Sequence, residues 1–216
     1  MSPGSGLRLA VLVSGEGSNL QAILDSVHGR AGIEIVAVGS NRADARGLER
    51  ARGAGVETAV FPRDEFADRS ARDVAMGDWL DARGAELVVL AGYMELLSSE
   101  FVLRYAGRMI NVHPSLLPAF PGLRAIQQAI DYGVRVMGVT VHFVDEGVDT
   151  GPIIAQEAFE VDPYALGVEA IEARVHAIEH QLLPRAIELI ASGAERVDPA
   201  APRRIVIEGG KRSGDE

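Results

Sequence analysis

The first half of the chain alternates short apolar runs with segments of helical period. The apolar runs have the length and composition of buried strands and lie at residues 7–13, 33–40, 58–61 and 86–93. Strands that alternate with helices of about 10 to 15 residues form βαβ units, in which helices cover both faces of a parallel sheet. The chain is therefore predicted to be an α/β protein with a Rossmann-like, mostly parallel twisted sheet and helices on both faces.

The segments between these runs predict the helices of the fold. Apolar residues recur at helical spacing in segments 20–27, 43–54, 64–83, 101–108, 123–131 and 168–189. The core residues predicted for the 64–83 helix are Phe66, Val74, Trp79 and Leu80. Pro184 is expected to bend or break the last helix. The run 87–91 is the most hydrophobic strand and is expected at the centre of the sheet.

The C-terminal part departs from this alternation. Strands predicted at 139–144 and 153–159 are joined by a short loop with Gly151 and Pro152 and without a helix, so antiparallel pairing is expected. After Gly193 we expect a surface strand and a frayed end at 209–216, and residues 1–6 are expected to be flexible. The whole of 1–216 is interpreted as a single domain.

Composition excludes several classes of function. The net charge of −10 repels nucleic-acid phosphates at long range, so small anions held by local backbone amides are the expected phosphate ligands. The chain has no cysteine, which excludes disulfides, thiolate nucleophiles and cysteine-ligated metals. It shows no signal peptide and no stretch of about 20 apolar residues. We therefore expect a cytoplasmic protein with no nucleic-acid or membrane partner.

Asn111 and His113 are the first candidates for chemistry. In an extended run both side chains point to one face, and Pro114 then ends the regular structure. An amide that can donate to a developing oxyanion, beside a group that can carry a proton, suits acyl transfer. A carboxylate from the acidic loop 145–152, folded back onto His113, would orient the ring and favour its charged form.

A glycine-containing turn, Ser14-Gly15-Glu16-Gly17-Ser18-Asn19, follows the first predicted strand. The glycines permit close backbone approach, and Ser18 or Asn19 can cap the helix that follows. Free N–H groups and the helix dipole then face the turn, which can hold an anion. The turn is too short for a Walker loop and lacks the full dinucleotide fingerprint.

Four motifs resemble a known signature. The formyltetrahydrofolate-dependent formyltransferases share the pattern of 111–118, Phe120-Pro121-Gly122, His142-Phe143-Val144 and Asp149-Thr150-Gly151-Pro152. The resemblance runs from about residue 7 to about residue 190 and is closest to members that act in purine synthesis. It implies the formyltransferase fold and transfer of a formyl group from the co-substrate 10-formyltetrahydrofolate to the amino group of glycinamide ribonucleotide.

The resemblance also implies roles for individual residues. Asn111, His113 and Asp149 would form a catalytic trio in which Asp149 keeps His113 charged. The ribonucleotide would lie with its phosphate on the glycine turn and its ribose on the last helix, bound by Gly17, Ser18, Asn19, His176 and Glu179. Without the resemblance, the face that carries His176, Glu179 and His180 is an ordinary solvated helix face.

The implied folate-binding residues come from separate parts of the chain. They are Arg69, Met94, Glu95, Leu96, Leu97, Asn111, Asp145, Glu146, Gly147, Val148 and Asp149. Arg69 on sequence alone is equally a solvated helix arginine. Glu95 departs from the family, since many relatives carry a basic residue there, and it is expected either to weaken a contact to the folate tail or to have no effect.

Other functions fit parts of this pattern. Methionyl-tRNA formyltransferases share the trio but add a C-terminal nucleic-acid-binding domain, for which no residues are expected to remain here. Formyltetrahydrofolate hydrolases use the trio behind an N-terminal regulatory domain. Another amine or sugar-nucleotide formyltransferase, and a non-catalytic folate- or nucleotide-binding protein, complete the alternatives. His142 is expected to make a structural hydrogen bond, and the transferred proton passes through His113 or a water. No metal is implied, and a homodimer is allowed.

Overall fold

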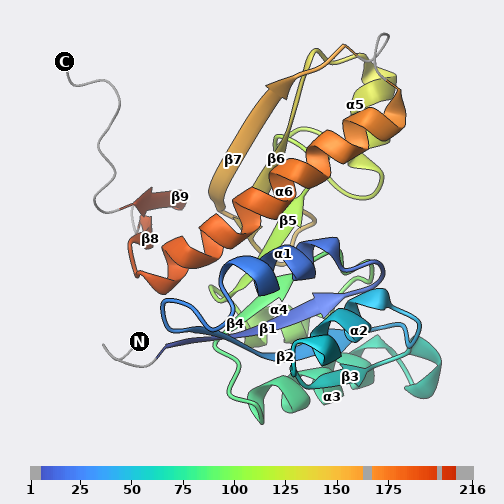
Figure 1. Ribbon diagram of the computed structural model, residues 1–216, viewed down its shortest axis with the longest axis vertical. Helices are drawn as coiled ribbons and strands as arrows, with labels where there is room; N and C mark the ends of the chain where they lie inside the picture. The colour runs from blue at the N-terminus through green and yellow to red at the C-terminus, as the bar shows by residue number, and fades with distance from the viewer. Residues whose placement is uncertain (1–5, 163–166, 199–200, 208–216) are drawn as a thin grey trace.

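The computed structural model describes residues 6–162, 167–198 and 201–207. They form one nine-stranded sheet in the order β3-β2-β1-β4-β5-β6-β7-β9-β8 (Figure 1). The flexible start expected at 1–6 lies outside the described residues apart from Gly6, and the frayed end expected at 209–216 lies wholly outside them. Among the described residues, no helix combines the length and the apolar character needed to cross a bilayer.

The N-terminal half of the sheet is parallel, as the alternation predicted. Its strands are β1 (Leu7–Val13), β2 (Ile33–Ser40), β3 (Thr58–Val60), β4 (Leu87–Leu90) and β5 (Met109–His113). The helices between them are α1 (Ser18–Ser26), α2 (Arg46–Gly53), α3 (Arg69–Asp81) and α4 (Ser99–Arg104). The very apolar β4 lies between β1 and β5, which confirms its predicted central place.

The C-terminal half is largely antiparallel. Strand β6 (Val136–Phe143) pairs antiparallel with β5, and β7 (Ile153–Glu160) pairs antiparallel with β6, which confirms the predicted hairpin. Helix α5 (Ala125–Tyr132) precedes β6, and the long α6 (Val168–Ala191) follows β7. The tail forms two strands, β8 (Glu195–Asp198) and β9 (Ala201–Ile207), where one was predicted.

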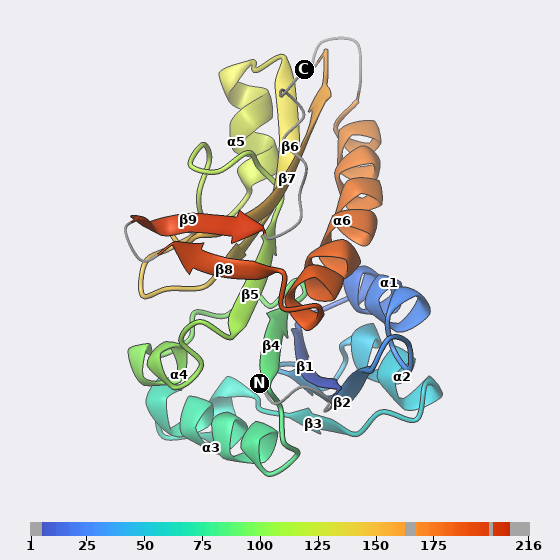
Figure 2. The ribbon, with the colours of Figure 1, turned by 90° about the vertical axis from the view of Figure 1, so that its left-hand side faces the viewer.

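Two apolar layers hold the helices to the sheet. Along β1, Leu9, Val11 and Val13 face a cluster with α1, α2 and α6, whereas Ala10 and Leu12 face a second cluster with α3 and α4. This split follows from the period of two along a strand. Figure 2 shows α1, α2 and α6 on one side of the sheet and α3 and α4 on the other. Helix α6 packs against both α1 and β6, so it spans the two halves.

The predicted 64–83 helix is wrong at its start. Residues Arg63–Glu65 form a short 3-10 turn, and α3 begins only at Arg69, because the Asp68 side chain accepts a hydrogen bond from the Ala71 N–H and caps the helix there. Val74 was predicted in the core but is 46% exposed. Pro184 lies inside α6 and does not end it. The other predicted elements differ from the observed ones by a few residues at their ends.

Candidate active site

Asn111 and His113 lie on the same face of β5, as the period of two predicted. His113 is only 5% exposed and Asn111 is partly buried. The antiparallel register places Asn111 opposite His142 and His113 opposite Thr140. One face of the sheet at β5 and β6 is therefore lined by polar groups from two neighbouring strands.

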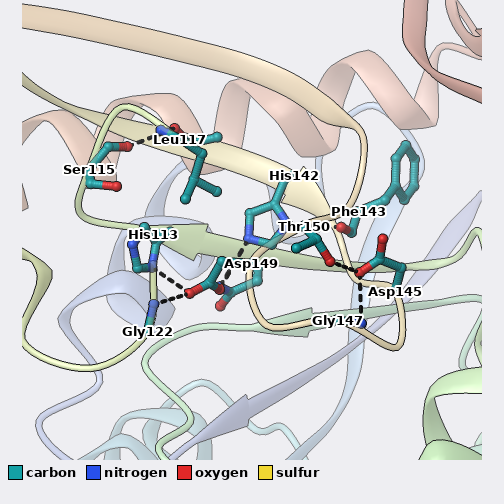
Figure 3. A network of polar contacts seen from close by, with 12 residues as sticks. His113, Ser115, Leu117, Gly122, His142, Phe143, Asp145, Gly147, Asp149 and Thr150 are labelled. Atoms are coloured by element: carbon teal, nitrogen blue, oxygen red, sulfur yellow. Dashed lines mark hydrogen bonds and ion pairs between the residues drawn. The ribbon is translucent and has the colours of Figure 1, made fainter. Parts of the chain in front are cut away.

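Asp149 reaches this face from the loop between β6 and β7. Its Oδ2 accepts a 2.7 Å hydrogen bond from the Gly122 N–H and lies 3.3 Å from His113 Nδ1 (Figure 3). Its Oδ1 lies 3.5 Å from the Asn111 amide nitrogen. Asp149 itself has a left-handed φ of 53°, a backbone conformation that is uncommon for non-glycine residues and that asparagine and aspartate adopt most readily. The structure thus brings the three predicted catalytic residues together.

His142 belongs to the same cluster. Its Nδ1 donates to the Phe143 carbonyl at 2.8 Å, so its Nε2 is the nitrogen that faces the site. That Nε2 lies 3.3 Å from Asn111 Nδ2 and 3.6 Å from Asp149 Oδ1. The predicted structural hydrogen bond exists, but sequence reasoning missed that the other nitrogen meets Asn111. Only the register of β5 against β6 would have revealed this contact.

The glycine turn has the geometry of an anion site. Gly17 caps α1 with a left-handed φ of 69°, and Ser18 and Asn19 form the first residues of the helix. A Cβ at Gly17 would lie 2.5 Å from Gly47 Cα on α2. Arg50 of α2 holds the turn. It donates to the Glu16 carbonyl at 2.9 Å and forms an ion pair with the Glu16 carboxylate at 2.6 Å.

Glu179 of α6 faces this turn and not the solvent. Its side chain is 6% exposed and its Oε2 accepts a 3.0 Å hydrogen bond from Asn19 Nδ2. The interpretation of this helix face as solvated is therefore wrong at Glu179, because α1 packs over it. His176 remains exposed and stacks on His180, with ring centroids 6.4 Å apart.

Apart from Asn111 on β5, the candidate folate residues lie on two loops and one helix start. Met94 and Leu96 are each 65% exposed, while Leu97 packs against the core cluster of α3 and α4. Glu95 forms an ion pair with Arg72 at 3.3 Å. Arg69 is the first residue of α3 and its side chain is exposed.

The second of these candidate loops contains Asp145, Glu146, Gly147, Val148 and Asp149. The loop is closed by Asp145, whose Oδ1 accepts hydrogen bonds from the Gly147 N–H at 3.1 Å and the Thr150 hydroxyl at 2.6 Å. The Val148 side chain is 54% exposed. This closed turn presents Val148 outwards and places Asp149 in the cluster.

Residues 7–187 match the family model described as formyl transferase. The chain belongs to the formyl transferase family. It is 44% identical over 191 residues to phosphoribosylglycinamide formyltransferase of Haemophilus influenzae, a match that covers 88% of this chain and 90% of that protein. A solved structure, glycinamide ribonucleotide transformylase 1 from Symbiobacterium toebii, has a TM-score of 0.89 and 46% identity over 95% of both chains.

Longer relatives match as well. The chain is 47% identical to the trifunctional purine biosynthetic protein adenosine-3 of Drosophila pseudoobscura pseudoobscura, with 92% of this chain covered. It spans only 15% of that protein and 19% of the Bos taurus counterpart.

In this formyl transferase the surroundings of Asp149 and His113 lower the pKa of both groups, with opposite consequences for their charge at neutral pH. Burial alone would raise the pKa of Asp149, but His142, whose Nε2 lies 3.6 Å away, and the hydrogen bond from the Gly122 N–H, together with His113, outweigh it and lower that pKa below its usual value. Asp149 is therefore ionised at neutral pH. Burial lowers the pKa of His113 below 6.5, and the Phe120 carbonyl and Asp149 only partly oppose that shift.

The prediction that Asp149 keeps His113 charged is wrong in its net outcome, because burial outweighs the carboxylate. Yet His113 Nε2 lies 2.9 Å from the Phe120 carbonyl, and Nδ1 faces Asp149. Either neutral tautomer leaves a ring lone pair against an acceptor oxygen, and adding a proton removes that repulsion. The ring is thus neutral at rest and well placed to take up a proton. Such a group beside an amide donor can serve acyl transfer.

Burial of the ionised Glu179 carboxylate costs free energy of folding, and a substitution can measure this cost. Burial raises its pKa, and the Asn19 amide and His176 only partly offset this shift. A carboxyl whose pKa is raised by folding lowers stability as pH rises above its unfolded value of about 4.3. Glu179→Gln is therefore expected to raise Tm at pH 7, also because the new amide can donate to Asn19 Oδ1, which has no partner among the described residues.

Differential scanning calorimetry measures this rise. Glu172→Gln, an exposed position on the same helix, is the matched control and should leave Tm unchanged. An unchanged or lower Tm in Glu179→Gln would contradict the free-energy cost assigned to the buried carboxylate.

Within the described residues, no three His, Asp or Glu side chains are arranged to hold a metal ion.

Proposed function

We propose that this formyl transferase moves the formyl group of 10-formyltetrahydrofolate to the amino group of glycinamide ribonucleotide, giving the N2-formyl product and tetrahydrofolate. The observation that carries the proposal is the cluster in which Asp149 lies within 3.5 Å of both His113 and Asn111. The name of the Haemophilus influenzae relative, which this chain matches over 90% of that relative's length, supports the same acceptor.

The reaction joins the amine nitrogen to the formyl carbon and then breaks the bond from that carbon to N10 of the folate. Negative charge develops on the formyl oxygen in the tetrahedral intermediate. The Asn111 amide donates to this oxygen, and the developing charge raises the proton affinity of the neighbouring His113 ring. One proton leaves the attacking nitrogen and one arrives on N10, through His113 or a water next to it. Asp149 stabilises the imidazolium in between.

The ribonucleotide is assigned to the α1 side of the site. Its phosphate meets the backbone N–H groups of Gly17, Ser18 and Asn19, where the helix dipole favours an anion. Glu179, which is held by Asn19, accepts from the ribose hydroxyls. His176 lies three residues before Glu179 on the same helix face and is exposed, so it can approach the phosphate.

The folate is assigned to the opposite side of the trio. Met94 and Leu96 offer exposed apolar side chains for the pteridine ring, and the 145–149 loop offers backbone groups and Val148. We assign Arg69, the exposed first residue of α3, to the anionic folate tail.

Incubation of the purified protein with both substrates tests the proposal. The expected result is an N-formylated ribonucleotide with one tetrahydrofolate formed for each, detected by mass spectrometry and by absorbance. Controls omit the ribonucleotide or replace the folate with tetrahydrofolate. Formate released at the same rate without the amine would identify a hydrolase instead, and unchanged substrates after prolonged incubation would identify a binding protein.

A further inference from the structure

Arg72 is a fully buried arginine on α3 whose guanidinium faces the loop after β4. The side chain is 1% exposed. It contacts Asp73 at 2.8 Å, the Glu95 carboxylate at 3.3 Å and the Leu96 carbonyl at 3.2 Å. One planar cation therefore joins its own helix to two consecutive residues of the 94–97 segment.

Further contacts fix the remaining backbone of this segment. Asp73, which is fully buried, uses its other carboxylate oxygen to accept from the Ser98 N–H at 2.6 Å. At the other end the Met94 N–H donates to the Ser14 hydroxyl at 2.8 Å. The backbone is thus held at Met94, Leu96 and Ser98. Since the side chains of Met94 and Leu96 remain 65% exposed, the segment presents two apolar groups on a rigid backbone.

This network is built from buried charged residues, which favours a role in positioning the 94–97 segment and not only in stabilising the fold. Buried ion pairs stabilise a fold no better than well-packed apolar residues of similar size, because both charges lose their hydration. Here Arg72 and Asp73 also contact the loop after β4, and not only each other. Arg72 also neutralises the charge of Glu95. The Glu95 side chain is 30% exposed and would otherwise place a free carboxylate beside the site proposed for the anionic folate.

We propose that Arg72 is a positioning residue for the folate, holding the 94–97 segment in its binding shape, and that Glu95 is its loop-side anchor and not a folate contact. This inference rests on the proposed function. It explains the acidic residue at position 95, because a carboxylate there completes the fork of Arg72.

Arg72→Lys tests the proposal. Lysine keeps a cation beside Asp73 but lacks the planar fork that reaches Glu95 and Leu96 together. We expect the KM for 10-formyltetrahydrofolate to rise about tenfold, as for one lost charge-assisted hydrogen bond, while the KM for the ribonucleotide stays within about twofold. Amide hydrogen exchange in segment 94–98 should accelerate, since its tether is weakened.

Glu95→Gln leaves the Arg72–Asp73 pair intact and serves if the first variant does not fold. Its folate KM should rise about threefold, a smaller effect because the Leu96 tether remains. Arg52→Met, an exposed arginine on α2, is the control and should change neither KM. Equal rises of both KM values, or an unchanged folate KM with accelerated exchange, would overturn the proposal.

The readouts separate this inference from the proposed function. If the parent protein transfers no formyl group, the proposed function fails, and calorimetric titration with 10-formyltetrahydrofolate then decides the role of Arg72. Weaker folate binding by Arg72→Lys than by Arg52→Met would support it. Equal binding by the two variants, or no binding by the parent, would refute it.

Discussion

Asp149→Asn is expected to lower kcat by about 100- to 1,000-fold, in the range for loss of one electrostatic or proton-transfer element of an active site. An asparagine oxygen that accepts from the Gly122 N–H takes the place of Oδ2, so it also lies against His113 Nδ1. The NH2 group then takes the place of Oδ1, near Asn111 Nδ2 and His142 Nε2. The variant thus keeps an acceptor beside the His113 ring but loses the negative charge that favours its protonation.

The pH dependence of this variant follows from the same contact. Asp149 opposes the effect of burial on His113, so removing its charge lowers the already depressed pKa of His113 further. Because the proposed reaction starts from the neutral ring, activity falls as pH drops through the His113 pKa, and in Asp149→Asn this fall occurs at lower pH than in the parent. NMR titration of the His113 ring and a pH profile of kcat measure both.

Asp145→Asn is the matched control for the His113 titration. Asp145 lies in the same loop, but its carboxylate bonds to Gly147 and Thr150 and not to the imidazole. The His113 pKa should therefore be unchanged in this variant. A His113 pKa that is insensitive to Asp149 as well would show that this carboxylate has another role.

His113 and Asp149 should also act as one unit. The double variant His113→Ala, Asp149→Asn is expected to be little slower than the slower single variant, because Asp149 acts on the reaction through the ring. Losses that multiply would mean that Asp149 contacts the reacting atoms independently.

Acidification offers a separate measure of Asp149. Its pKa is lowered on folding, so its ionisation stabilises the fold above about pH 3.9, and that contribution is lost as pH falls through the folded-state pKa. The Asn variant lacks this term, so the stability difference between parent and variant should shrink on acidification.

The parallel half of the sheet was predictable because its strands are buried on both faces and appear as continuous apolar runs. Helix boundaries were less predictable where a cap decides them. With Asp68 as its cap, α3 starts five residues after the predicted 64–83 helix begins, which leaves Phe66 outside the helix. Val74 lies inside the helix but on an exposed face. Periodicity identifies an apolar face but does not specify which turn begins the helix.

The candidate site was predictable only where its residues are close in sequence. Asn111 and His113 share a face by strand geometry, which local sequence determines. Contacts across long separations were not predictable from the residues alone. The burial of Glu179 depends on Asn19, 160 residues away, and the contact of His142 with Asn111 depends on the register of β6. Arg72 showed only a weak signal, an Arg-Asp pair one helical turn after Arg69.

Gly17→Ala is expected to raise the KM for the ribonucleotide by about 10- to 100-fold while changing the folate KM little. Gly17 has a φ of 69°, and a non-glycine residue in a sparsely populated conformation costs about 1 to 3 kcal/mol. A Cβ would also lie 2.5 Å from the backbone of Gly47, so α2 or the turn must move. Either movement misplaces the N–H groups that would hold the phosphate.

Gly15→Ala provides the matched control on the other side of Glu16. A Cβ at Gly15 meets nothing within 4 Å, and its φ lies outside the left-handed region, so the same methyl group is tolerated there. Steady-state kinetics with each substrate varied in turn, with Tm recorded for both variants, separate a local effect from a loss of stability. If Gly17→Ala raises both KM values equally, or if the two alanine variants behave alike, the turn does not hold the phosphate. If only Gly17→Ala raises the KM for the ribonucleotide, binding of this substrate depends on the left-handed backbone conformation at Gly17, which glycine adopts without strain.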